Sequence, residues 1–292
     1  MRKFVIRISV FLLIVSIGLA LDESYRLLSD KYQKDHKNNL VSVYHTIAKS
    51  KKKKKTKKIL LGDSVAQQLY PNLAYNDSIY SLACNQTITV AGHYFLLNNF
   101  VNINKNELPE EVIFFYRPLS LKDNLGIYSF SYFLKPFYNR EYKSLMDTCL
   151  IKRIKTIPLY FISQFPLIKT SNYTPKFCVP QEEPFNEIFS PITKNYLKKI
   201  EQLCRNNNLR FRFEPAPISK SEWDTLQLFN NIDYPLDTMI IKNYFQHIQY
   251  FEDSLFIDDV HFKPQYIPQD YLNLIGNAKP THHTTDSLGI LK

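Results

Sequence analysis

Glycine is scarce in this sequence: the 292 residues include 6 glycines, against 16 prolines, 20 tyrosines and 21 phenylalanines. Repeat folds built on regular glycine turns are therefore excluded, and the chain shows no internal period. Because 45% of the residues are hydrophobic and 22% are charged, the disordered and collagen classes are also excluded. This apolar content suits one sizeable core, so we expect a single globular domain after the N-terminal segment.

Cofactor and metal motifs are lacking as well. The sequence contains no phosphate-binding loop, no dinucleotide fingerprint and no paired metal-binding motif. We therefore expect neither a cofactor nor a metal ion. The four cysteines are also spaced too widely for a zinc site; they are Cys84, Cys149, Cys178 and Cys204.

A basic surface is lacking too, despite a net charge of +10. Ten basic residues in two groups account for this charge. They are Arg2, Lys3 and Arg7 near the N-terminus and the run Lys51 to Lys55 with Lys57 and Lys58. The rest of the chain is close to neutral and no aromatic residues lie among the lysines, so we expect no nucleic-acid partner. The lysine run predicts a solvated, flexible linker, and a patch for phosphate or anionic lipid is the alternative.

The longest uncharged apolar run lies at the N-terminus. Residues Ile8 to Leu21 carry no charge, basic residues precede them, and Asp22 and Glu23 follow. This polarity predicts that the rest of the chain lies outside the cytoplasm, next to the membrane. Residues 1–21 are short for a spanning helix and also typical of a signal peptide. They predict a signal anchor, which we favour, or a cleaved signal peptide.

An oxidising compartment would allow three pairings of the four cysteines. Cys178 and Cys204 flank a predicted helix and are the first pair to test. Four reduced, buried thiols are the alternative.

Three regions are expected after the apolar segment. Residues 22–58 predict a helical stalk and the lysine-rich linker, residues 59–276 the folded domain, and residues 277–292 a polar tail. The apolar runs that build the core begin at residue 59. We therefore expect the folded body to survive removal of residues 1–58.

Four short apolar runs predict buried strands: Ile59 to Leu61, Ile79 to Ala83, Val112 to Tyr116 and Leu209 to Phe213. Helix-compatible stretches separate the last three runs, at residues 87–100 and 192–205. Buried strands alternating with helices predict an α/β protein, a three-layer α/β/α sandwich with a mainly parallel sheet. Ligands bind beyond the carboxyl ends of such strands, so the residues that follow each run are the candidate site.

The first run is followed by Gly62, Asp63 and Ser64 and then by a helix-like stretch. A serine on a sharp turn from strand to helix is exposed and can act as a nucleophile. The alternative is an ordinary helix N-cap at Asp63 or Ser64. The place of this tripeptide after the first strand, in a chain with few glycines, favours the functional interpretation.

A second polar motif lies near the other end of the chain, where Asp258 precedes His261 by three residues. An aspartate at this spacing can hydrogen-bond the imidazole and leave its far nitrogen free to take a proton from a serine. Asp259 is at the wrong spacing for the same contact. Four other histidines are expected to be structural or solvated: His93, His247, His282 and His283.

Together these two motifs resemble the SGNH (GDSL-like) hydrolase superfamily, which pairs an early Gly-Asp-Ser with a late Asp-x-x-His on a flavodoxin-like sandwich. The resemblance extends over about residues 59–275. It implies that Ser64 is the nucleophile, His261 the general base and Asp258 the residue that orients the base. The pattern looks like the divergent exported branch of the superfamily, which includes domains that acetylate or deacetylate surface polysaccharides.

The family's two oxyanion blocks are matched only in part. Where the family has a glycine after the second strand, this chain has Asn85 and Gln86, so the resemblance implies that Gln86 offers its backbone N–H, with Asn85 beside it. The third block is normally Gly-x-Asn-Asp, and Asn124 is the candidate side-chain donor here. Both departures from the family pattern bear on how well an oxyanion is held.

The resemblance implies an exported or membrane-tethered serine esterase or O-acyltransferase. Its expected partners are an acylated polysaccharide or a small ester, and the acyl group is expected to be acetyl. One alternative is a non-catalytic module of the same fold that binds polysaccharide or scaffolds an envelope assembly. Another is a basic anchor protein whose lysines dock on an anionic polymer or lipid.

Overall fold

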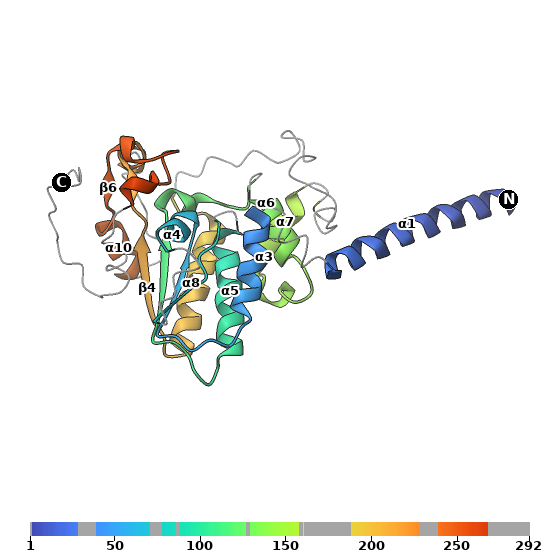
Figure 1. Ribbon diagram of the computed structural model, residues 1–292, viewed down its shortest axis with the longest axis horizontal. Helices are drawn as coiled ribbons and strands as arrows, with labels where there is room; N and C mark the ends of the chain where they lie inside the picture. Colours follow the sequence, from blue (N-terminus) through green and yellow to red (C-terminus); the bar gives the residue numbers. More distant parts are fainter. Residues whose placement is uncertain are drawn as a thin grey trace.

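The computed structural model describes residues 2–28, 39–70, 78–85, 88–126, 129–157, 160, 188–227 and 239–267. Its N-terminal helix α1 (Arg2–Leu28) extends away from the body (Figure 1). The part from Arg2 to Leu21 is long and apolar enough to cross a membrane, and none of it is buried against the protein. An apolar N-terminal helix of this kind is compatible with a signal anchor or a membrane anchor.

Four parallel strands form the central sheet in the order β2-β1-β3-β4. This confirms the predicted α/β class with a parallel sheet. The strands are β1 (Lys58–Gly62), β2 (Ile79–Ser81), β3 (Glu111–Tyr116) and β4 (Arg210–Pro215). A separate parallel pair joins β5 (Ile218–Ser219) to β6 (Tyr250–Phe251).

The helices fall between the strands, as expected for parallel connections. Besides α1, the α-helices are α3 (Asn39–Ser50), α4 (Ser64–Leu69), α5 (Thr89–Ile103), α6 (Phe130–Phe137), α7 (Thr148–Thr156), α8 (Pro191–Asn206), α9 (Lys220–Gln227) and α10 (Met239–Gln246). Short 3-10 turns are η2 (Pro118–Lys122), η3 (Lys143–Leu145), η7 (Asp253–Leu255) and η8 (Pro264–Tyr266).

Both faces of the sheet are buried, and the strand alternation divides the apolar side chains between two cores. Ile59 and Leu61 of β1 belong to the larger core, whereas Leu60 between them belongs to the smaller one. The same alternation separates Phe114 from Phe115 on β3. Successive side chains of a strand point to opposite faces, so a continuous apolar run requires cover on both sides.

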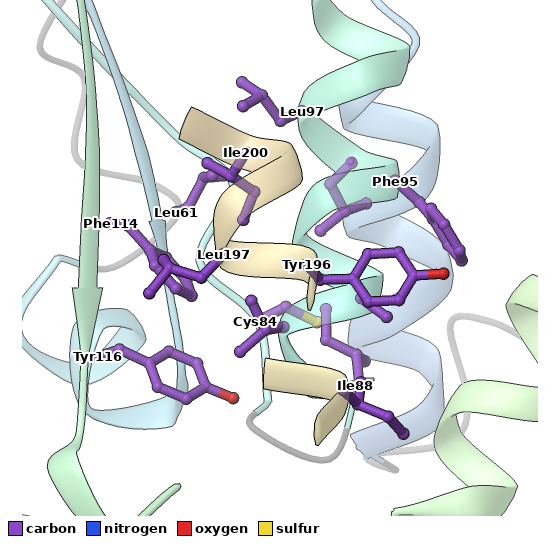
Figure 2. Packing of buried hydrophobic residues seen from close by; sticks show 14 of the residues in the cluster. Leu61, Cys84, Ile88, Phe95, Leu97, Phe114, Tyr116, Tyr196, Leu197 and Ile200 are labelled. Carbon is purple, nitrogen blue, oxygen red and sulfur yellow. The ribbon is translucent and has the colours of Figure 1, made fainter. Parts of the chain in front are cut away.

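The larger core lies between the sheet and a layer of helices in which α3, α5 and α8 run side by side (Figure 1). Figure 2 shows Phe95 of α5 near Tyr196 of α8 in this core, and their ring centroids lie 5.9 Å apart. Burying each such side chain contributes roughly 1.5–3 kcal/mol before the cost of ordering the chain. Helix α8 begins at this layer because the Ser190 hydroxyl accepts the Thr193 N–H at 3.1 Å and caps the helix.

The smaller core differs from the sandwich that we expected. Among the described residues, this face is covered by the six-residue helix α4 and by the C-terminal segment Phe251–Ile267. The rings of Phe256 and Phe262 stack with centroids 4.4 Å apart and are almost fully buried. Aromatic side chains from a short-turn segment thus replace much of the second helical layer.

Helix α3 lies in the part of the chain that we expected to be a stalk. Its residues Val43 and Ile47 belong to the larger core, and Val43 is fully buried. The Ser50 hydroxyl accepts a hydrogen bond of 3.0 Å from the Asn99 amide on α5. The expectation that the body starts at residue 59 is therefore wrong, because α3 has an apolar stripe that α5 and α6 cover.

The lysine run is also more ordered than the expected flexible linker. The Asn104 side chain accepts the Lys54 N–H at 2.9 Å and donates to the Lys52 carbonyl at 3.2 Å. Lys51 forms an ion pair of 2.6 Å with Glu141. Lys58 begins β1 and lies 3.5 Å from the buried Glu111 carboxylate. The run is held at the end of α5, near α6 and at the start of β3, because its backbone and two of its charges have partners there.

Three of the four cysteines lie in the described residues, and all three are free. Cys84 and Cys204 are buried, whereas Cys149 is partly exposed. Burial raises the pKa of Cys204 to about 12, so the thiol is protonated at neutral pH. Cys178, the predicted partner of Cys204, lies outside the described residues.

We predict that a fragment of residues 39–292 melts cooperatively and that a fragment of residues 59–292 does not. The shorter fragment loses α3 and exposes the apolar surface of α5 to water. In the full chain, Val43→Ala should lower the free energy of unfolding by about 2 kcal/mol, because two buried carbons are lost and a cavity remains. Calorimetry and urea unfolding measure both effects.

The exposed His45 on the same helix provides the control for this prediction. His45→Ala should change the free energy of unfolding by less than about 0.5 kcal/mol. Equal melting temperatures for the two fragments would show that α3 adds nothing to the body.

His93 on α5 is fully buried beside two aromatic rings of β3. Its ring centroid lies 5.4 Å from those of both Phe114 and Tyr116. Neither of its ring nitrogens has a hydrogen-bond partner in the described part of the chain. Burial lowers the pKa of His93 to about 3, so the imidazole is neutral at physiological pH.

We predict that His93 makes the fold sensitive to acid. The pKa of an unfolded histidine is about 6.5, so the unfolded chain binds one more proton than the native one between about pH 6.5 and pH 3. The contribution of His93 to the free energy of unfolding is complete above pH 6.5 and falls by about 1.4 kcal/mol per pH unit below it. Urea unfolding at pH 7, 6, 5 and 4 measures this slope, and His93→Leu should reduce it by that amount. Parallel pH curves for the wild type and His93→Leu would contradict the prediction.

Candidate active site

The candidate site lies at the carboxyl ends of β1 and β3, which are neighbours in the sheet. The chain passes from β1 to β2 on one side and then crosses to β3 on the other, so the connections leave in opposite directions here. Ligands of open parallel sheets bind in the crevice at such a switch point. Asp63 and Ser64 follow β1, and Arg117 follows β3.

Gly62 allows the turn between β1 and α4 to pass close to β3. A Cβ atom at this position would lie 2.3 Å from the Phe115 carbonyl oxygen and 2.4 Å from the Ala66 Cβ. A backbone atom cannot move away as a flexible side chain can. The glycine is therefore required by the close approach of the strand, the turn and the first turn of α4.

Asp63 is fully buried at this turn and connects both strand ends. Its Oδ1 accepts the backbone N–H groups of Val65 at 3.0 Å and Ala66 at 3.4 Å, which caps α4. Its Oδ2 accepts the Arg117 backbone N–H at 2.8 Å. Burial raises the pKa of Asp63, and these three hydrogen bonds and the Arg117 charge oppose the rise. The N-cap alternative from the sequence thus holds for Asp63.

Ser64 is the first residue of α4 and its side chain is partly exposed. Because Asp63 provides the cap, the Ser64 hydroxyl is not used for that purpose. It makes no hydrogen bond to another described residue. The serine therefore presents an uncommitted hydroxyl at the switch point.

Asp258 and His261 form the hydrogen-bonded pair that their spacing predicts. The His261 Nδ1 lies 2.9 Å from Oδ2 and 3.1 Å from Oδ1 of Asp258. Asp258 Oδ1 also accepts the backbone N–H of His261 at 2.8 Å. The loop turns sharply here because Asp259 adopts a left-handed φ of 60°. Partial burial acts to raise the pKa of Asp258, but the hydrogen bonds from His261 outweigh it and lower the pKa.

Gln68 joins this loop to the helix that begins with Ser64. Its Nε2 donates to the Phe262 carbonyl at 2.8 Å, and its Oε1 accepts the Phe262 N–H at 3.0 Å. Residues 64 and 68 are four apart and so lie on one face of α4. Phe262 follows His261 directly, so the contact brings the two predicted motifs to the same helix across 194 positions of sequence.

The structure shows no direct hydrogen bond between Ser64 and His261. Of the three oxyanion candidates, the described residues include Asn85 and Asn124. The Asn85 backbone N–H bonds to the buried Cys84 thiol. Gln86 lies outside the described residues. The Asn124 side-chain oxygen is buried with no hydrogen-bond partner in the described part of the chain, and no bond connects Asn124 to Ser64.

An ion pair between Arg117 and Glu222 is a feature that the sequence analysis missed. Arg117 Nε lies 2.6 Å from Glu222 Oε2, and the Glu222 side chain is 3% exposed. Glu222 Oε1 also accepts the Leu119 N–H at 3.4 Å. Burial raises the pKa of Glu222, and the Arg117 charge opposes this. The two residues are 105 positions apart, so no local pattern could have revealed the pair.

No group of three or more histidine, cysteine, aspartate and glutamate side chains among the described residues could hold a metal ion. Comparison of the chain with protein-family models, with curated proteins and with solved structures gives no match. The arrangement of Ser64, Asp258 and His261 must therefore be judged on its own geometry.

We predict that Asp63→Asn lowers the free energy of unfolding by about 1–3 kcal/mol. An amide keeps one acceptor for Val65 and Ala66, but its NH₂ group then faces the Arg117 N–H, and two donors meet without an acceptor. Urea unfolding at pH 7 measures the change. The control is Asp224→Asn, because Asp224 is 61% exposed and, within the described part of the chain, pairs with Lys220 one turn earlier on α9. That variant should change the free energy by less than about 0.5 kcal/mol. Similar losses in the two variants would contradict the bridging role of Asp63.

Proposed function

We propose that this protein is a membrane-tethered or exported serine esterase or O-acyltransferase of the SGNH type. It acts on acyl esters, namely acetyl esters of surface glycans, on the extracytoplasmic side of the membrane. The basic residues before the apolar part of α1 support this orientation. The strand order β2-β1-β3-β4 is compatible with the flavodoxin-like sheet of that superfamily.

One observation carries the proposal: the Asp258–His261 pair is attached to the helix that begins with Ser64. The pair is formed at 2.9 Å, and Gln68 bonds the residue next to His261 at 2.8 and 3.0 Å. Two motifs that are distant in the sequence thus meet at the same helix, which supports their assignment as nucleophile, base and orienting acid. Hydrogen bonds between a catalytic serine and its base are often completed only with substrate, so the missing Ser64–His261 bond is compatible with activity.

The mechanism is acyl transfer through a covalent intermediate. His261 Nε2 takes the Ser64 hydroxyl proton while Ser64 Oγ attacks the ester carbonyl, and Asp258 accepts from Nδ1–H and stabilises the imidazolium. The tetrahedral intermediate collapses to the acyl-enzyme, and His261 gives the proton to the departing alcohol. Water in an esterase, or a sugar hydroxyl in a transferase, then repeats these steps on the acyl-enzyme.

The negative oxygen of the intermediate needs hydrogen-bond donors. We assign this role to the backbone N–H groups of Ser64 and Gln86 and to the Asn124 amide, with Asn85 beside them. An enzyme that lacks one such donor is slower by about 10²- to 10³-fold.

A non-catalytic module that binds polysaccharide is the second candidate. The absence of a Ser64–His261 hydrogen bond among the described contacts is the observation that favours a non-catalytic role. A basic anchor protein has less support, because Lys51 and Lys58 are already paired with Glu141 and Glu111.

We predict that the purified body, residues 39–292, hydrolyses a small activated acetyl ester and that a fluorophosphonate labels Ser64. Ser64→Ala should abolish both reactions, because only an activated serine reacts with this probe. His261→Ala should lower the labelling rate by at least about 10³-fold, since the base is lost. Esterase assays and mass spectrometry of the labelled peptide measure the two effects.

Ser254→Ala is the matched control, because Ser254 is exposed in the histidine loop, the segment 252–267 that carries His261, and has no role in the mechanism. It should keep full activity. Equal hydrolysis by the wild type and Ser64→Ala would favour the binding module. If an added oligosaccharide acceptor diverts the acetyl group from water to sugar, the transferase is favoured over the esterase.

A further inference from the structure

We propose that Gln68 is a positioning residue that sets the place of the general base relative to the nucleophile. This inference rests on the proposed function and names a residue with no role in the predicted triad. Gln68 forms hydrogen bonds with both backbone groups of Phe262, the residue that follows His261. It therefore acts on the base through the backbone rather than by touching the reacting atoms.

The geometry of the two bonds explains why one side chain is enough. A glutamine amide has a donor and an acceptor side by side, and these match the carbonyl and N–H of a single extended residue. Two bonds from a planar group fix both the distance and the rotation of the peptide that they hold. Since Gln68 lies one helical turn after Ser64, the amide and the nucleophile are held on the same face of α4.

The histidine loop has few other polar bonds to the body. Within the described residues, the hydrogen bonds that leave the segment 252–267 go to Gln68 on α4 and, from Asp253, to α9 at Ser221. Asp253, which accepts the bonds from Ser221, lies eight residues before His261. Apolar packing of Phe256 and Phe262 keeps the loop against the smaller core. Hydrophobic contacts are not directional, so this packing alone does not fix the orientation of the backbone next to His261. Gln68 thus provides the directional contact next to the base.

The neighbouring Gln67 gives a matched control on the same helix. Its Nε2 donates to the Ser42 hydroxyl on α3 at 3.2 Å, so it makes no bond to the histidine loop. Both residues are partly exposed glutamines in a six-residue helix. A general effect of removing a glutamine from α4 is therefore separated from the loss of the loop contact.

The test compares Gln68→Ala, Gln68→Glu and Gln67→Ala in the full chain for fluorophosphonate labelling, steady-state kinetics and melting. We expect Gln68→Ala to lower kcat and the labelling rate by about 10²-fold with KM nearly unchanged, since a base displaced by about 1 Å costs that much. Gln67→Ala should stay within about twofold of the wild type. Hydrogen exchange of the Phe262 N–H should become faster in Gln68→Ala and stay slow in Gln67→Ala.

Gln68→Glu separates positioning from folding. An ionised glutamate keeps the acceptor for the Phe262 N–H but cannot donate to the Phe262 carbonyl, and it regains the donor when it is protonated. Its activity relative to the wild type should therefore rise as the pH falls, which a loss of packing alone would not produce.

The outcomes distinguish this proposal from the proposed function. Equal labelling and kcat in folded Gln68→Ala and in the wild type would overturn the role of Gln68 and leave the esterase intact. Unchanged exchange of the Phe262 N–H in Gln68→Ala would overturn it too. A wild type that reacts with neither the ester nor the fluorophosphonate would overturn the proposed function itself.

Discussion

The buried carboxylate of Asp63 fixes the edge of the sheet on which the candidate site is built. Three backbone N–H groups from two chain segments converge on it, at 2.8 to 3.4 Å. A buried charge is stable only when such donors replace the lost water. Once Asp63 is satisfied, the start of α4 and the start of the connection after β3 have fixed places relative to each other, and Ser64 is left with an uncommitted hydroxyl.

At the opposite edge of the sheet, a buried acid is held by basic side chains instead of backbone N–H groups. Glu111 begins β3 and is 1% exposed, with Lys58, Arg210 and Arg212 at 3.0 to 3.5 Å from its carboxylate. The first residues of β1 and β4 are thus paired through the first residue of β3. The two ends of the sheet are each fixed by a buried acid, one with backbone partners and one with basic side chains. Between these two ends, the interiors of β1 and β3 are apolar, whereas β4 also carries Arg212 and Glu214.

The parallel sheet could be predicted from the sequence because its strands are apolar runs at the right intervals, and the Asp258–His261 pair because its spacing is local. Three features could not be predicted. Helix α3 is preceded by polar residues and followed by lysines, so its short apolar stripe resembled a stalk. Gln68 looked like any exposed helix residue, because its partner is a backbone 194 positions away. The contact between Arg117 and Glu222 depends on the relative positions of β3 and α9 in the fold. In each case the determinant is a tertiary contact rather than a local pattern.

The contact of α3 with α4 determines where the N-terminal segment joins the body. Ser42 lies in the first turn of α3 and accepts a hydrogen bond from Gln67 on α4, so the chain that leads back to α1 leaves the body at the edge that carries Ser64. Ten residues separate α1 from α3, and at full extension they reach at most about 40 Å. The N-terminal segment therefore joins the body beside Ser64, at the edge of the sheet opposite Glu111.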